Sequence, residues 1–145
     1  MGSHIHFNKR FEPKYAKFQN YCKSKDMNFC TKEEVDNAYV NSIAYTDYVL
    51  KEILKRFKDK NTILFYTSDH STDLAYINKE ENRTVVPAFL WYNNGLLNKY
   101  KNTIENNIQK FDFTHKKIIS TLFDCVGIEF DTVDKKNSIC SEDYK

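Results

Sequence analysis

The sequence has few residues that interrupt regular structure, and it has no long apolar or basic run. Only 3 glycines and 2 prolines occur among its 145 residues, which excludes a low-complexity or linker protein. No apolar run approaches the ~20 residues that a membrane-spanning helix needs. The polar start after Met1 is also unlike a signal peptide, so the chain as written would stay in the cytoplasm. The N-terminus of an excised piece, however, says nothing about location.

The charges are nearly balanced, with 22 basic residues against 20 acidic ones and a net charge of +2. Lys9-Arg10 and Lys116-Lys117 are short basic pairs and not extended patches, so nucleic acid is not expected as a partner. The residues that are abundant indicate a packed core, since 41% are hydrophobic and 15% aromatic. A chain of this length fits one compact domain.

A long helix is predicted from Thr31 to about Lys60. Thr31 and Glu34 have the spacing of a capping box, in which each side chain satisfies a backbone N–H at the start of the helix. Apolar and small residues then recur every three or four positions and form one stripe. The stripe consists of Val35, Tyr39, Ser42, Thr46, Val49, Ile53 and Phe57.

Two strands are predicted, over residues 62–68 and 85–92. Both are continuous apolar runs with little alternation, which is typical of strands buried on both faces of a parallel sheet. Pro87 lacks a backbone N–H, so it should lie at the beginning of its strand or on an unpaired edge.

The remaining segments give weaker patterns. The first thirty residues lack periodicity and are predicted to be mostly loop, and the polar tail from Asp134 is predicted to be frayed. Residues 114–126 form a second amphipathic pattern that ends at Gly127, and residues 128–133 could form a short strand. The side chains of the 114–126 helix that are predicted to face inward are Ile118, Ile119, Leu122 and Phe123.

This order of elements predicts the α/β class, with a mostly parallel sheet and flanking helices. A parallel sheet of two or three strands would expose apolar edges unless another segment covered them. We therefore expect part of the fold to be missing, and an exposed sheet edge predicts self-association.

Ser68-Asp69-His70 follows the first predicted strand directly. Ligands of open α/β sheets bind at the carboxyl ends of strands, and carboxylate and imidazole are both zinc ligands. Two ligands do not make a site, so a polar turn that caps the strand remains the simpler alternative.

The other histidines and the cysteines are ambiguous by themselves. His4 and His6 lie in a start, Met1-Gly2-Ser3-His4, that also matches an expression-tag remnant. His115 fits a surface or capping role, and Cys125 fits the core. Cys22 and Cys30 bracket a polar loop that a disulfide could close, but two free thiols in a reducing cytosol fit equally well.

Several segments, in order, resemble the bacterial phosphoethanolamine transferases. The matching residues are Gly2-Ser3-His4, Phe7, Lys9-Arg10-Phe11-Glu12-Pro13, Phe18, Cys22, Cys30-Thr31-Lys32-Glu33, Asn37-Ala38-Tyr39, Asn41, Tyr45-Thr46-Asp47-Tyr48, Leu64-Phe65-Tyr66-Thr67-Ser68-Asp69-His70 and Val86-Pro87-Ala88-Phe89-Leu90-Trp91. The match covers about residues 1–92, with a looser fit in the C-terminal helix. It favours Gly2-Ser3-His4 as native sequence.

The resemblance implies a partial alkaline-phosphatase-like (sulfatase) fold, with residues 1–145 as the C-terminal portion of the catalytic domain. Members of the family face the periplasm from the inner membrane, to which an N-terminal anchor holds them. They move phosphoethanolamine from a phospholipid donor to lipid A or another surface glycan. By resemblance, Asp69 and His70 would bind zinc, and His4 would contact the transferred phosphate or a second zinc ion. Cys22 and Cys30 would form a disulfide.

Two departures from the family pattern limit this expectation. The nucleophilic threonine and a further acidic ligand of the family lie upstream of the Gly-Ser-His segment, so the chain alone is expected to be inactive. After the Asp-His pair the family continues Gly-Glu-Ser and then supplies another histidine. This chain reads Ser71-Thr72-Asp73-Leu74 and has no further histidine before His115. The site is therefore either divergent or degenerate.

Two alternatives remain open. One is a sulfatase or phosphodiesterase of the same superfamily, which would also place Asp-His after a buried strand. The other is a non-catalytic α/β remnant or interaction domain, in which Asp69 and His70 only cap the strand.

Overall fold

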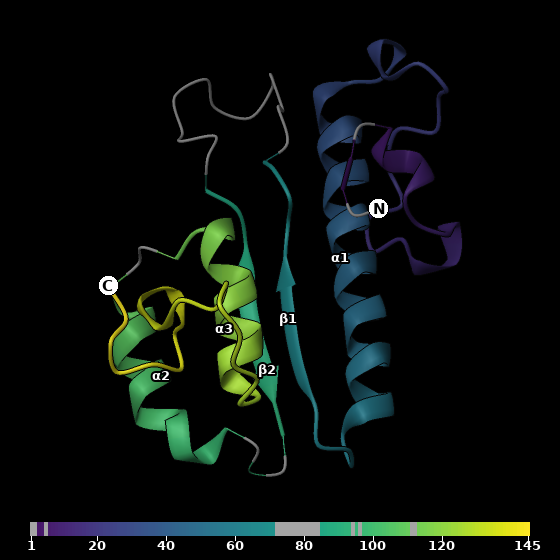
Figure 1. Ribbon diagram of the computed structural model, residues 1–145. Helices are drawn as coiled ribbons and strands as arrows, with labels where there is room; N and C mark the ends of the chain where they lie inside the picture. Colours follow the sequence, from purple (N-terminus) through teal and green to yellow (C-terminus); the bar gives the residue numbers. More distant parts are fainter. Residues whose placement is uncertain (1–2, 5, 72–84, 94, 96, 111–112) are drawn as a thin grey trace. The chain divides into compact units, whose positions relative to one another are not determined.

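The computed structural model describes residues 3–4, 6–71, 85–93, 95, 97–110 and 113–145 (Figure 1). Its longer elements are α1 (Lys32–Phe57), β1 (Ile63–Thr67), β2 (Ala88–Tyr92), α2 (Lys101–Ile108) and α3 (Ile118–Cys125). Its short 3-10 helices are η1 (Phe7–Lys9), η2 (Pro13–Tyr15), η3 (Met27–Phe29), η4 (Asn98–Tyr100), η5 (His115–Lys117) and η6 (Lys135–Asn137).

The chain divides into two compact units. The N-terminal unit consists of Met1–Arg56 and His70–Pro87, and the C-terminal unit consists of Phe57–Asp69 and Ala88–Lys145. Each unit has a hydrophobic cluster of its own, so each is described by itself.

In the N-terminal unit, the predicted capping box opens α1. The Thr31 backbone N–H donates to the Glu34 carboxylate at 2.8 Å, and the Glu34 N–H donates to the Thr31 hydroxyl at 3.3 Å. The helix buries Val35 and Ala38 against Phe7 and Cys22 of the preceding irregular segment. The predicted helix is therefore confirmed, but its buried stripe stops early, since Val49 is exposed.

Asn41 holds the preceding segment against α1, and no sequence pattern indicated this. Its side chain is fully buried. Its carbonyl oxygen accepts from the backbone N–H groups of Lys17 and Phe18, at 2.9 and 3.0 Å. Its amide group donates to the Phe18 carbonyl at 2.9 Å. The side chain thus replaces a strand or helix as the hydrogen-bonding partner of the loop.

In the C-terminal unit, β1 and β2 form an antiparallel pair, and the expected parallel arrangement is not observed. Thr67 at the end of β1 lies opposite Ala88 at the start of β2, and Ile63 lies opposite Tyr92. A continuous apolar run reports which faces of a strand are buried, and not the direction of its neighbour. Pro87 directly precedes β2, as its missing N–H requires.

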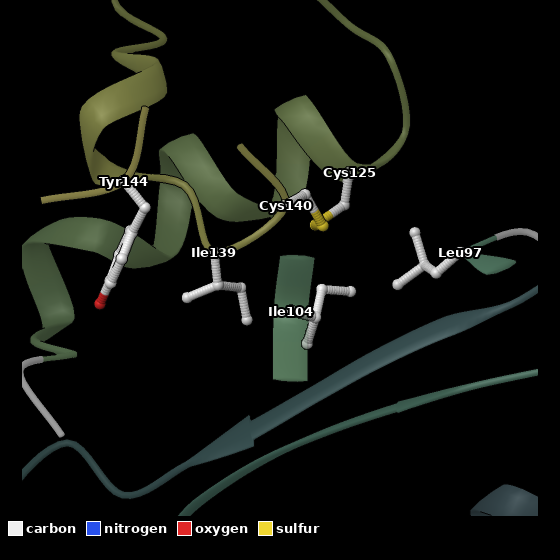
Figure 2. Close-up of a cluster of buried hydrophobic side chains, with 6 residues drawn as sticks. All are labelled: Leu97, Ile104, Cys125, Ile139, Cys140 and Tyr144. Atoms are coloured by element: carbon white, nitrogen blue, oxygen red, sulfur yellow. A yellow bond between two sulfur atoms is a disulfide. The ribbon is translucent and has the colours of Figure 1, made fainter. Parts of the chain in front are cut away.

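The core of the C-terminal unit lies between α2, α3 and the C-terminal tail. Figure 2 shows its buried side chains, which are Leu97, Ile104, Cys125, Ile139, Cys140 and Tyr144. Strand residues Ile63, Leu90 and Tyr92 pack against this cluster. Helix α2 was not anticipated from the sequence, because it buries only Ile104 and Asn107 on an otherwise polar helix.

Two predictions for the end of the chain are wrong. Residues 128–133 form no strand, because local bonds hold their backbone in turns, including Ile128 N–H to Phe123 O at 2.9 Å and Val133 N–H to Phe130 O at 2.8 Å. The tail beyond Asp134 is not frayed, since Ser138, Ile139, Cys140 and Tyr144 are buried. A disulfide and several side-chain contacts hold it, as described below.

Helix α3 is observed over Ile118–Cys125, and Gly127 follows its C-terminal end as predicted. The helix begins later than predicted, because His115–Lys117 form the 3-10 helix η5, and its orientation also differs from the prediction. Gly127 has a positive φ of 76°, a conformation that favours glycine. The residues of α3 that are buried are Ser120, Thr121 and Cys125, whereas Ile119 is 54% exposed. The more polar face of the helix thus faces the core of the unit.

Candidate functional site

The strand β1 that precedes Asp69 and His70 is anchored at its opposite end by Asn93. The Asn93 amide group donates to the carbonyls of Phe57 and Lys58, at 2.7 and 2.6 Å. Its side-chain oxygen accepts from the Thr62 N–H at 3.1 Å, and its own N–H donates to the Thr62 carbonyl. These bonds fix where β1 begins, so the paired strand delivers Ser68-Asp69 to a defined end of the hairpin.

In the N-terminal unit, His70 lies beside His4. The centres of the two imidazole rings are 6.0 Å apart, with an angle of 76° between the ring planes. Both side chains are exposed, and the His70 Nδ1 atom lies 2.8 Å from the Ser71 carbonyl. Two residues that the sequence singled out at distant positions are therefore brought together.

In the C-terminal unit, His115 contacts the strand end that carries Asp69. Its Nε2 atom lies 2.7 Å from the Ser68 carbonyl and 3.5 Å from the Thr67 hydroxyl oxygen. Because a carbonyl only accepts, the Nε2 atom is the donor in the first contact. The sequence favoured a surface or capping role for His115. Its contact with the strand end could not be derived from local sequence, because 47 positions separate it from Ser68.

In the N-terminal unit, the side chains of His4 and His70 carry imidazole nitrogens, a donor type that zinc uses. Two imidazoles on one tetrahedral zinc ion, each at ~2.1 Å, would have ring centres about 5 Å apart. The centres of the His4 and His70 rings lie 6.0 Å apart, which is farther than this value. Within the described ranges, no group of three or more His, Cys, Asp or Glu residues is placed to hold a metal ion.

Other parts of the predicted site lie beyond what the structure describes or belong to different units. Asp69 belongs to the C-terminal unit, whereas His4 and His70 belong to the N-terminal one. Gly2 and the Thr72-Asp73-Leu74 segment, where the sequence departs from the family pattern, lie outside the described residues.

All four cysteines are paired. Cys22 and Cys30 are joined across the loop that precedes α1, with 5.6 Å between their Cα atoms. Cys125 of α3 is joined to Cys140 of the tail. The sequence suggested only a core role for Cys125; the signal that could have revealed the second disulfide was the even number of cysteines.

Shifted pKa values occur on the exposed surface of α1. A hydrogen bond with Tyr15 raises the pKa of Tyr48, and a hydrogen bond with Lys55 lowers the pKa of Glu52. Both groups make side-chain pairs at the surface, and these pairs account for the shifts.

Comparisons with known proteins relate the chain to a family of enzymes. The family model described as Sulfatase matches residues 1–128. The phosphoethanolamine transferase EptA of Escherichia coli O157:H7 is 29% identical over 148 residues, which cover 89% of this chain and 27% of EptA. The phosphatidylethanolamine transferase Mcr-2 of E. coli is 31% identical, over 84% of this chain and 24% of Mcr-2. The Kdo(2)-lipid A phosphoethanolamine 7''-transferase of Salmonella typhimurium is 33% identical, over 50% of this chain and 13% of that protein.

The chain therefore spans about a quarter of the length of EptA and Mcr-2. No solved structure matches it.

Proposed function

The chain belongs to the sulfatase family, and from this premise we propose that it is the C-terminal, zinc-binding portion of a phosphoethanolamine transferase. In this proposal the whole enzyme moves phosphoethanolamine from a phospholipid donor to lipid A or another surface glycan. The nucleophilic threonine comes from a part of the enzyme that precedes the residues seen here. The chain alone therefore binds metal but does not catalyse transfer.

The observation that carries the proposal is the pairing of His70 with His4. The two residues belong to separate segments that both match the transferases in sequence, and their rings lie 6.0 Å apart. If His70 only capped the end of the strand, there would be no reason for the imidazole of His4 to lie beside it. The relatives agree with this proposal, since EptA and the Kdo(2)-lipid A enzyme are phosphoethanolamine transferases.

Each residue has a defined part in this proposal. His70 and Asp69 are zinc ligands, and His4 contacts the transferred phosphate or a second zinc ion. Zinc, when bound, neutralises negative charge on phosphoryl oxygens and lowers the pKa of a hydroxyl group. The hairpin holds Asp69 through its fixed register, and His115 holds the Ser68 carbonyl next to it.

The proposed cellular location of the whole enzyme follows from its proposed lipid substrates and not from any feature of this chain. We propose that the whole enzyme works at the periplasmic face of the inner membrane, where an N-terminal anchor holds it. Among the described residues, no helix is long and apolar enough to cross a membrane. Oxidising conditions there would suit the two disulfides.

Zinc titration of the purified, oxidised chain by calorimetry tests the proposal. We expect His70→Ala and Asp69→Asn each to weaken zinc binding at least about tenfold, since each removes a donor atom. His4→Ala should also weaken zinc binding if the His4 imidazole holds a second zinc ion, and should leave it unchanged if that imidazole contacts only the phosphate. His6→Asn is the matched control, because it removes an imidazole from the same terminal segment and asparagine tolerates the positive φ of 64° at this position. Equal zinc affinity in all four variants would overturn the proposed site.

The alternative, that the enzyme is a sulfatase or phosphodiesterase, can be distinguished from a transferase by the substrate that the enzyme turns over. The chain can be joined to the part of E. coli O157:H7 EptA that precedes the matched stretch. This chimaera is then assayed with a phosphoethanolamine lipid and with a sulfate ester. Turnover of the lipid alone would support transfer, and turnover of the ester alone would favour the alternative.

A further inference from the structure

The loop between Cys22 and Cys30, just before α1 (Figure 1), carries the most exposed large apolar side chain of the described residues. Phe29 is 84% exposed, whereas the other exposed large apolar side chains in the described ranges reach at most 71%. Removing a phenyl ring from water is favourable, so this position is unfavourable for the chain by itself. A single exposed apolar residue is ordinary on a protein surface, and the surroundings of Phe29 therefore decide whether the ring has a role.

Local bonds fix the backbone that carries the ring. The disulfide joins the two ends of the loop, and the Asn8 side-chain amide donates to the Ser24 carbonyl at 2.7 Å. The Asp26 carboxylate accepts from the Asn28 N–H at 3.0 Å and caps the 3-10 helix η3, of which Phe29 is the last residue. Because the loop is already ordered, little conformational entropy would be lost when the ring is buried against a partner.

The charges in the loop complement a surface of phosphate groups. Lys23 and Lys25 are exposed, and Asp26, whose carboxylate caps η3, is the one acidic residue between the two cysteines. Beyond the loop, the charges of Lys32 and Glu33 offset each other. An apolar ring flanked by lysines suits the interface of a membrane, where the ring enters the acyl boundary and the ammonium groups attract anionic lipid.

The proposed function supplies the reason for a lipid surface. An enzyme that takes phosphoethanolamine from a phospholipid and passes it to lipid A meets both molecules at a membrane. The choice of a membrane as the partner rests on that proposed function, whereas the exposure of Phe29 and the order of its loop do not.

We propose that the loop between Cys22 and Cys30 binds a phospholipid bilayer by inserting the Phe29 ring at its surface. In this contact Lys23 and Lys25 lie at the level of the phosphate groups. The loop thus adds a contact with the membrane in the N-terminal unit, which also contains His4 and His70.

Co-sedimentation of the purified, oxidised chain with vesicles of phosphatidylethanolamine and phosphatidylglycerol tests the proposal. We expect Phe29→Ser to lower the partition coefficient at least about tenfold, because the apolar contact is lost. Lys25→Gln should lower it about fivefold. Phe18→Ser is the matched control, since it removes a 45% exposed ring of the same unit outside the loop, and should change the partition coefficient by less than about twofold. The melting temperature of Phe29→Ser should stay within about 1 °C of the parent, because the replaced ring is exposed.

A tryptophan at position 29 gives an independent result. Brominated acyl chains quench a tryptophan that reaches them, and the single tryptophan of the parent, Trp91, sets the background. Stronger quenching in Phe29→Trp than in Phe18→Trp would support the proposal. It would be overturned by quenching of Phe29→Trp at the background level, by equal partition of Phe29→Ser and the parent, or by a parent that does not bind the vesicles. Neither zinc nor transfer is measured, so this proposal can fail while the zinc titration succeeds, and the reverse.

Discussion

The two units each hold an irregular segment against a helix with one disulfide and one buried asparagine, but the disulfides are placed differently. In the N-terminal unit Asn41 of α1 binds the loop at Lys17 and Phe18, and the Cys22–Cys30 disulfide lies entirely within the irregular segment. In the C-terminal unit the Asn107 amide of α2 donates to the Ile139 and Ser141 carbonyls, and the disulfide joins α3 to the tail itself.

Because the disulfides are placed differently, the asparagine and the disulfide contribute differently to stability in the two units. In the N-terminal unit the covalent bond only shapes a loop, so noncovalent contacts hold that loop against α1. The three hydrogen bonds of Asn41 are the buried part of these contacts, and the Cys22 N–H adds a bond to the Glu34 carbonyl. In the C-terminal unit the covalent bond attaches the tail directly, and Asn107 adds to an attachment that already exists. The asparagine should therefore matter more in the N-terminal unit, and the disulfide more in the C-terminal unit.

Asn41→Ala is expected to have the largest effect. The substitution leaves two backbone N–H groups and one carbonyl without their buried partner, and each such group costs ~1–3 kcal/mol. We expect a loss of about 4 kcal/mol in the local stability of the N-terminal unit, measured by hydrogen exchange of the α1 amides. Asn37→Ala on the same helix removes one exposed bond, to the Asn20 carbonyl, and should cost less than about 1 kcal/mol. Similar losses for the two variants would refute the role of Asn41.

Replacing both Cys125 and Cys140 with serine is expected to have the next largest effect. The disulfide closes a sequence separation of 15 residues, for which the loss of chain-entropy stabilisation is about 3 kcal/mol. Limited proteolysis should then cut within residues 134–145, which the oxidised chain protects. Serine at both Cys22 and Cys30 serves as the comparison and should leave the tail protected. A tail that resists proteolysis without its disulfide would contradict the proposed division of tasks.

Asn107→Ala is expected to have the smallest effect of the three. It leaves two buried carbonyls without a donor, while the disulfide still holds the tail in place. We expect a loss of about 2 kcal/mol in urea unfolding, because an unpaired carbonyl costs less than an unpaired N–H group. Asn106→Ala, one position earlier and exposed, controls for the change in helix propensity. A loss larger than that of Asn41→Ala would reverse the comparison.

The sequence predicted the elements whose signals are local. The capping box and the spacing of Val35 and Ser42 lie within a few turns of one another, and they specify the start of α1 and its first buried turns. The apolar runs of β1 and β2 are equally local. Gly127 marked the end of α3, because a positive φ there favours glycine.

Features that depend on distant partners could not be predicted in this way. The antiparallel pairing of β1 depends on β2, and the burial of the tail depends on Thr121 and Asn107. The inward face of α3 was wrongly predicted, because the apolar stripe was assumed to face the core of this chain. For the candidate site, the residues themselves came from the resemblance to a family, and the structure added the approach of His4 to His70 and the contact of His115 with Ser68.

The position of Asn93, beside the start of β1 and the end of β2, bears on how related proteins can differ in the segment between the strands. Asn93 fixes the register of β1 and β2 from the end of the strand pair that lies opposite to Thr67 and Ala88. Insertions between the two strands would leave the register of β1 and β2 in place and would cost loop-closure entropy, about 0.6 kcal/mol for each doubling of length. The length of this connection can therefore change between related proteins without any change in how β1 and β2 pair.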